Sequence, residues 1–382
     1  MKNNKWLKQA LPAAVVLGMS AQAGAAITLY DKDDTRFSVD GLLNTFAVST
    51  ETKTGGVTTK QARVMMGFLP NYIGFNFFKQ AGDLKLAARS SFWVTINDSD
   101  RFRSGGPSGG LGRGDSVGTE TGIDVRQFYA TVGSSWGEVL IGKDFALFGR
   151  SNILGDEMLL GYGQTHTVTA DAANVSFGNI GTGYLYPFPV SQISYRSPKM
   201  GGFQLAVGLM DPNKASASSE ESSPRIEAEA TFAGEFDSGS YSLWLGGMSQ
   251  SSETTPGVEV DANGVSFGAK VKFAGLSLSA SGFDASGVGA AGLSNFVTAD
   301  DADVKGNLLQ ASYSFGSERL VISRGENKGG TTAGASDLDL ENTGLAWFHT
   351  VNDNLQLVAE YDKAENPATE VRSIAIGAVL TY

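Results

Sequence analysis

The side chains that most often perform catalysis are scarce in this chain of 382 residues. It contains two histidines, His166 and His349, and no cysteine. A serine hydrolase needs a histidine base beside a nucleophile and an orienting partner. No nucleophile motif surrounds His166 in Gln164-Thr165-His166-Thr167, and His349 directly follows Trp347-Phe348 near an expected strand end. We therefore expect no catalytic residues and interpret both histidines as polar residues of an interior or an interface.

Motifs for metals, cofactors and nucleic acids are also weak. Without cysteine, a disulfide framework and a cysteine zinc site are excluded. The acidic run 31–34 lacks the glycine and terminal glutamate of a calcium loop, and the run 300–303 is either a divalent-cation site on an exposed loop or simply solvated. The glycine-rich stretch 104–110 is not followed by the Gly-Lys-Ser/Thr of a phosphate loop. A net charge of -11 argues against a nucleic-acid partner, so no cofactor, metal or nucleic acid is expected.

The N-terminus has the order of a secretory signal peptide. Lys2, Lys5 and Lys8 precede a short apolar stretch at 10–19, which is followed by small residues suited to cleavage. The apolar stretch is too short for a spanning helix, which needs about 20 apolar residues. We expect residues 1–26 to be a signal peptide and 27–382 to form one mature domain, whose net charge is then -14.

Apolar residues alternate with small or polar ones along most of the mature chain. In the final segment, for example, Ile374, Ile376 and Leu380 alternate with Ser373 and Gly377. Alternation places one apolar face against one polar face of a strand. Segments of roughly ten residues with this pattern and aromatic ends are typical of transmembrane barrels, in which the apolar face meets lipid.

About sixteen such segments can be counted, the even number expected of a single-chain barrel. The second segment is expected to break at Pro70. Tight turns and longer polar loops alternate between the segments, which favours a barrel over a soluble sandwich. The predicted fold is therefore all-β, a transmembrane antiparallel barrel of about 16 strands. A plugged transporter is disfavoured because it needs 22 strands and a longer chain.

Several stretches resemble the general porins of Gram-negative outer membranes. They are 27–41 after the cleavage region, 126–133 with 136–143, and the expected hairpin 193–203. A C-terminal aromatic residue is also typical of that family, although it is usually Phe and here it is Tyr382. The resemblance covers essentially the whole mature chain. It implies a sixteen-stranded homotrimer whose third loop, here residues 147–189, folds inward and narrows the channel.

The resemblance also implies a constriction in which acids of the third loop face basic residues of the wall. On the loop, the candidates are Asp156, Glu157 and Asp171. On the wall, alternation places Lys85, Arg89 and Arg196 inward, and Arg126 matches a family position if Tyr129 faces outward. The alternative is that these charges are solvated at other heights of the lumen. The aromatic residues near the loop either guide an organic solute or, as we favour, hold the loop to the wall.

The expected function is an outer-membrane porin, a water-filled channel for passive diffusion of small hydrophilic solutes and ions. The alternatives are a solute-selective channel, for organic acids or similar compounds, and a surface-binding barrel without transport. Besides the homotrimer and the solutes, the expected partners are outer-membrane lipid and lipopolysaccharide. A mature charge of -14 weakly favours cations over anions.

Overall fold

The computed structural model describes residues 26–96, 123–163, 176–214, 216–291, 301–331 and 339–382. The expected signal peptide lies outside this part of the chain, except for Ala26. One short helix, α1 (Arg150–Gly155), accompanies the strands in these ranges. The strands are β1 (Ile27–Lys32), β2 (Thr35–Thr54), β3 (Val57–Met65), β4 (Asn71–Ala81), β5 (Leu84–Val94), β6 (Ile123–Ser134), β7 (Gly137–Phe145), β8 (Pro189–Arg196), β9 (Phe203–Met210), β10 (Arg225–Phe236), β11 (Gly239–Thr255), β12 (Val258–Phe273), β13 (Leu276–Ser286), β14 (Asp303–Phe315), β15 (Glu318–Gly329), β16 (Leu340–Thr350), β17 (Leu355–Glu365) and β18 (Thr369–Thr381).

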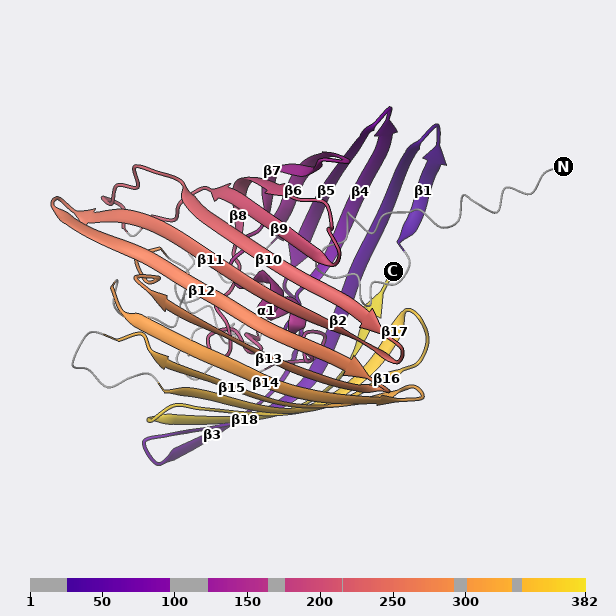
Figure 1. Ribbon diagram of the computed structural model, residues 1–382. Coiled ribbons are helices and arrows are strands. Elements are labelled where there is room, and N and C mark those ends of the chain that lie inside the picture. The colour runs from indigo at the N-terminus through magenta and orange to yellow at the C-terminus, as the bar shows by residue number, and fades with distance from the viewer. Residues whose placement is uncertain (1–25, 97–122, 164–175, 215, 292–300, 332–338) are drawn as a thin grey trace, which may run out of the picture.

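The strands close into one antiparallel barrel (Figure 1). From β4 onward each strand pairs with the next along the chain, and β18 returns to pair with β2. β3 pairs with the second half of β2 and β4 with its first half, so β3 and β4 are two pieces of one wall strand. β1 pairs back on the start of β2. The wall therefore has 16 strands, which confirms the predicted fold, including the strand break before residue 71.

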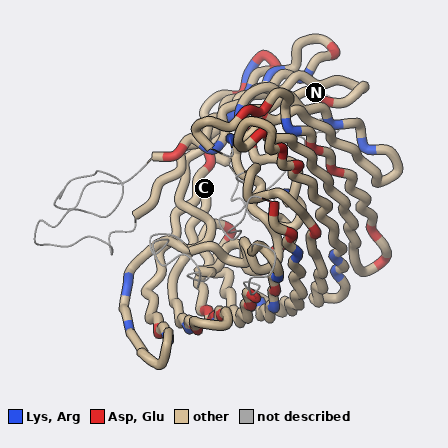
Figure 2. The backbone as a smooth tube through the Cα atoms, turned by 90° about the vertical axis from the view of Figure 1, so that its left-hand side faces the viewer, with Lys and Arg blue, Asp and Glu red and all other residues tan. Residues whose placement is uncertain are grey.

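The two faces of the wall differ as the alternation predicted. In β18, the outward Ile374, Ile376 and Leu380 are exposed, whereas the inward Ser373 and Ala375 are buried. Figure 2 shows acidic and basic residues crowded toward the two ends of the barrel, with long uncharged stretches of strand between them. An apolar outer band between charged rims is the arrangement that a bilayer requires. Within the described residues, no helix is long and apolar enough to cross a membrane.

The predicted alternation of tight turns and long loops fails at three places. β2 and β3 are joined by Gly55 and Gly56, β11 and β12 by Pro256 and Gly257, and β17 and β18 by residues 366–368. The first two hairpins are built from unusually long strands that continue past the rim, and their turn glycines adopt positive φ. Such glycines permit tight hairpin turns, so these connections extend from the wall without a long loop.

Candidate functional site

The segment between β7 and β8 folds into the barrel and runs along its inner wall. Its first part begins beside β10, where the backbone N–H groups of Leu147 and Phe148 donate to the Glu227 carboxylate at 2.7 and 2.8 Å. It ends beside β17, where the N–H groups of Tyr162 and Gly163 donate to Glu360. The inward fold of this loop is thus fixed by wall carboxylates, which satisfy backbone donors that sheet pairing leaves open.

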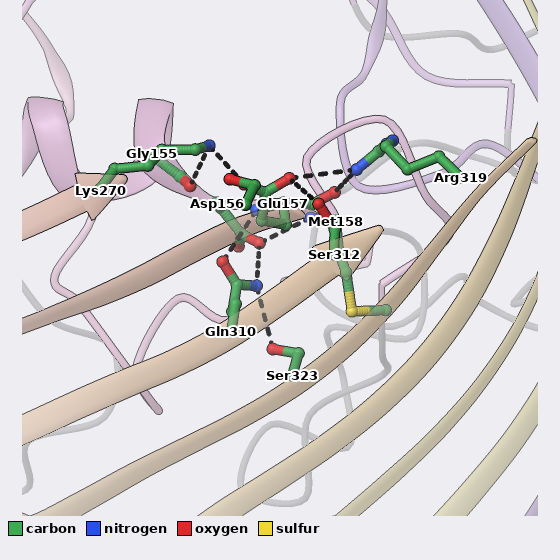
Figure 3. A network of polar contacts seen from close by, with 10 residues as sticks. Gly155, Asp156, Glu157, Met158, Lys270, Gln310, Ser312, Arg319 and Ser323 are labelled. Carbon is green, nitrogen blue, oxygen red and sulfur yellow. Dashed lines mark hydrogen bonds and ion pairs between the residues drawn. The ribbon is translucent and has the colours of Figure 1, made fainter. Parts of the chain in front are cut away.

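A charged cluster holds the tip of the loop, at the end of α1 (Figure 3). Glu157 forms ion pairs with Lys270 of β12 at 2.7 Å and Arg319 of β15 at 3.3 Å. Its carboxylate also accepts hydrogen bonds from Ser277 and Ser312. All four partners come from the wall, so we name this group the tip clamp.

The clamp is largely removed from solvent. The Glu157 side chain is 7% exposed, and its two basic partners are less than a fifth exposed. Burial alone would raise the pKa of Glu157, but the charges of Lys270 and Arg319 and the Ser277 hydrogen bond outweigh it, so the pKa is lowered. The carboxylate therefore stays ionised where an ordinary glutamate would begin to protonate.

Asp156 is also turned toward the wall and the returning part of the loop. Its carboxylate accepts hydrogen bonds from the Gln310 amide at 2.6 Å, the Tyr184 hydroxyl at 2.7 Å and the Asn179 amide at 2.9 Å. Neither Asp156 nor Glu157 forms a described contact with the four predicted wall residues. Asp171, the third predicted loop acid, lies outside the described residues.

Aromatic side chains fix the loop against the wall. Tyr162 and Tyr184 are fully buried, and Tyr162 packs against Phe46 of β2. Near β8, the Tyr186 ring contacts Phe145, which in turn contacts Trp93 of β5. These contacts support the interpretation that the aromatic residues hold the loop in place, because Tyr162 and Tyr184 are buried and offer no surface to a passing solute.

The predicted wall residues divide into two kinds. Arg89 forms an ion pair with Asp40 of β2 at 2.7 Å and donates to Gln127, so its charge is neutralised. Lys85 and Arg196 also lie on inward positions, partly exposed, but within the described residues neither has an acidic partner within 4.0 Å. Three of the four candidates therefore share the lumen face of β5 and β8, as alternation predicted.

Arg126 points inward for a reason that alternation did not supply. The pairing of β5 with β6 shifts where Ser91 opposes Gln127 but Phe92 opposes Val125, which leaves Arg126 in a bulge. Tyr129 faces inward, so the outward orientation expected for it was wrong. The Arg126 guanidinium lies 5.0 Å from the Trp93 ring and donates to the Tyr186 hydroxyl. It anchors the returning part of the loop near the rim.

Four residues that hold the loop or its wall contacts were not among the predicted site residues: Lys270, Arg319, Arg225 and Glu227. Lys270 lies on the small, polar face of an alternating strand, which indicates an inward side chain but not its partner. Arg225 and Glu227 stand two residues apart on one strand face, which is the spacing that lets them pair. The partners of Glu157 depend on the path of the loop, which local patterns do not encode.

The strand break at residues 66–70 also projects inward and supports the loop. Asn44 of β2 accepts a hydrogen bond from the Gly67 N–H and donates to the Leu69 carbonyl, both at 2.6 Å. The Phe68 N–H then donates to the Gly161 carbonyl of the loop. A Cβ at position 67 would stand 2.5 Å from that carbonyl, so glycine is required by the close approach.

Replacing Asn44 with alanine is expected to destabilise this support. The variant leaves the Gly67 donor and the Leu69 acceptor unpaired, and each buried unpaired group costs about 1–3 kcal/mol. The measurement is the denaturant midpoint of the folded barrel, compared with Thr45→Ala, whose side chain faces outward on the same strand. Equal midpoints for the two variants would contradict a supporting role for Asn44.

The comparisons with known proteins agree with this architecture. The family described as Gram-negative porin matches residues 13–369. No curated protein matches the chain. Among solved structures, the anion-selective porin from Comamonas acidovorans is 13% identical with a TM-score of 0.64, covering 91% of this chain and 100% of that one. The outer-membrane channel DcaP of Acinetobacter baumannii is 14% identical with a TM-score of 0.64, covering 93% and 100%. The trimer form of OmpT from Vibrio cholerae is 14% identical with a TM-score of 0.56, covering 92% and 100%.

Proposed function

Because the chain belongs to the Gram-negative porin family, it is an outer-membrane channel for passive diffusion of small solutes. We propose that its inward loop forms the constriction that limits the rate of this diffusion. The observation that carries this proposal is the attachment of the loop to wall side chains from β10 to β17. A segment held in this way narrows the lumen permanently. The proposed constriction comprises Asp156, Glu157 and Asp171 on the loop and Lys85, Arg89, Arg126 and Arg196 on the wall.

The ion pairs near the loop weaken the electric field between loop acids and wall bases that the family resemblance implied. The Arg89–Asp40 pair is internally neutralised, and in the tip clamp Glu157 offsets one of the two positive charges of Lys270 and Arg319, so both groups contribute less field across the passage than unpaired bases would. We propose that the general negative charge of the mature chain leaves a weak preference for cations. A reversal potential that indicates strong anion preference under a salt gradient would contradict this proposal.

We further propose that residues 1–26 are removed on export, that the channel has no enzymatic activity, and that it works as a homotrimer. The trimer proposal is supported by the trimer form of the structurally similar OmpT from Vibrio cholerae. Outer-membrane phospholipid and lipopolysaccharide are its proposed neighbours, because the outer face carries an apolar band between charged rims.

Swelling of liposomes that contain the purified protein tests the proposed transport. We expect uncharged sugars to enter at rates that fall steadily with their size, because a fixed constriction sieves by dimension. Saturation by one class of solute would favour a solute-selective channel, and absence of entry would favour a surface-binding barrel. A trimer band that disappears only after heating is expected on a denaturing gel, and a heat-independent monomer band would contradict the trimer.

A further inference from the structure

One row of the lumen wall carries charges of alternating sign that do not neutralise each other. Across the sheet, Lys85 of β5 opposes Gly133, Gly133 opposes Glu138, and Glu138 opposes Arg196. On the next strands, Arg196 opposes Ala206 of β9, and Ala206 opposes Glu229 of β10. The row therefore reads positive, negative, positive, negative, and the two uncharged residues in it, Gly133 and Ala206, are small.

The three charges at the start of this row differ from the paired charges of Arg225–Glu227 and the tip clamp. Lys85, Glu138 and Arg196 are each partly exposed, and within the described part of the chain none has an oppositely charged atom within 4.0 Å. Elsewhere in the lumen, Arg225–Glu227 and the tip clamp are tightly paired and buried. The row thus presents a carboxylate and two cations that have no counter-charge in direct contact within the described residues.

The separation within the row suits a small solute that carries both charges. Glu138 and Arg196 are directly opposed on neighbouring strands, where Cβ atoms lie about 4.5–5.5 Å apart. Their charged ends are more than 4.0 Å apart, so they do not satisfy each other. A solute with its ammonium group at Glu138 and its carboxylate at Arg196 would give each of these two wall charges a counter-charge.

The surrounding charge is balanced. Among the described residues, the other charges that act on Glu138 and Arg196 are Arg150 of α1, Asp144 of β7 and Glu229, and Arg150 lies 3.7 Å from Asp144. With Lys85, Glu138 and Arg196 this neighbourhood holds three cations and three anions. A balanced neighbourhood does not attract a simple cation or anion by net field, but it does attract a dipole aligned with the row.

We propose that Glu138 and Arg196, assisted by Lys85, form a binding step for zwitterionic solutes such as α-amino acids. This inference rests on the proposed transport through the constricted lumen and adds the class of solute that it favours. The solute contacts the wall through charge-assisted hydrogen bonds, with its ammonium on Glu138 and its carboxylate on Arg196. The side chain of the solute then faces the open lumen.

Relative swelling rates of liposomes test this step. In the wild type, we expect a zwitterionic amino acid to enter several-fold faster than an uncharged solute of equal size. Glu138→Gln and Arg196→Gln should each abolish this advantage and shift the reversal potential in opposite directions, toward anions and cations respectively. The double variant E138Q/R196Q should restore the wild-type reversal potential but not the amino-acid advantage.

The matched control is Lys143→Gln, which removes a charge from the outward face of β7 and should keep the advantage. An unchanged amino-acid advantage in the double variant would overturn the proposal. Loss of entry for uncharged solutes in the wild type would instead overturn the proposed transport, so the two failures are distinguishable. Normal heat-modifiable gel mobility of each variant shows that the barrel has folded.

Discussion

Glu157→Gln is expected to raise the single-channel conductance and to make the current fluctuate between levels. The substitution removes the only acidic charge of the tip clamp and leaves Lys270 and Arg319 without their counter-charge. Breaking a buried ion pair in this way costs about 3–5 kcal/mol, and partial exposure of the cations places the cost near 3 kcal/mol. Since 1.4 kcal/mol corresponds to a factor of ten, the detached loop should become about 100-fold more populated.

Two further variants make the test specific. Lys272→Gln removes a lumen cation two residues from Lys270 that does not touch Glu157, and its channels should conduct as the wild type does. The double variant E157Q/K270Q removes both charges of the shorter pair and should be less disturbed than E157Q alone. Equal conductance for E157Q and the wild type would show that the clamp does not hold the loop.

The same clamp predicts how the channel responds to acid. A carboxylate whose pKa is lowered in the folded state contributes stability above its unfolded pKa, and loses it as the pH falls through the folded value. Because the Lys270 and Arg319 charges lower the pKa of Glu157 below 4.5, the difference in conductance between the wild type and Glu157→Gln should stay constant as the pH falls to that value. Below it, the current should approach that of Glu157→Gln, and an earlier change would contradict the assignment.

The fold followed from the sequence because its signal is local. Alternation with period two identified every wall strand, and it also placed Lys85, Arg89 and Arg196 on the lumen face. It failed at Arg126, where a one-residue bulge changes the side to which the following residues point. Register irregularities of this kind depend on the partner strand and are not visible in one segment alone.

The charge partners could not be predicted in the same way. The family resemblance led us to expect loop acids opposite wall bases of β5–β8, whereas Glu157 meets Lys270 and Arg319 on the other side of the barrel. Both arrangements satisfy the alternation pattern equally well. The choice between them depends on how the loop crosses the lumen, which involves contacts separated by more than 100 positions in the sequence.

Glu227→Gln is expected to lower the free energy of unfolding by about 3–5 kcal/mol, the usual cost of removing one partner from a buried ion pair. The Arg225 and Glu227 side chains are both 0% exposed, and the Arg225 Nε lies 2.8 Å from the Glu227 carboxylate. Two nitrogens of the Arg225 guanidinium already lack hydrogen-bond partners within the described residues. Removing the Glu227 charge would leave the buried Arg225 cation without the acid that it pairs with among the described residues.

The same substitution should also disturb the start of the loop, because the second carboxylate oxygen of Glu227 accepts the N–H groups of Leu147 and Phe148. The measurement is denaturant unfolding of the barrel in detergent, with Glu235→Gln as the matched control. Glu235 is exposed on the same strand, so its variant should change stability by less than about 0.5 kcal/mol. Equal losses in the two variants would mean that Glu227 acts only as one more surface charge. A larger loss of stability for Glu227→Gln, together with faster proteolysis at the start of the loop, would identify Glu227 as the residue that joins the wall to the constriction.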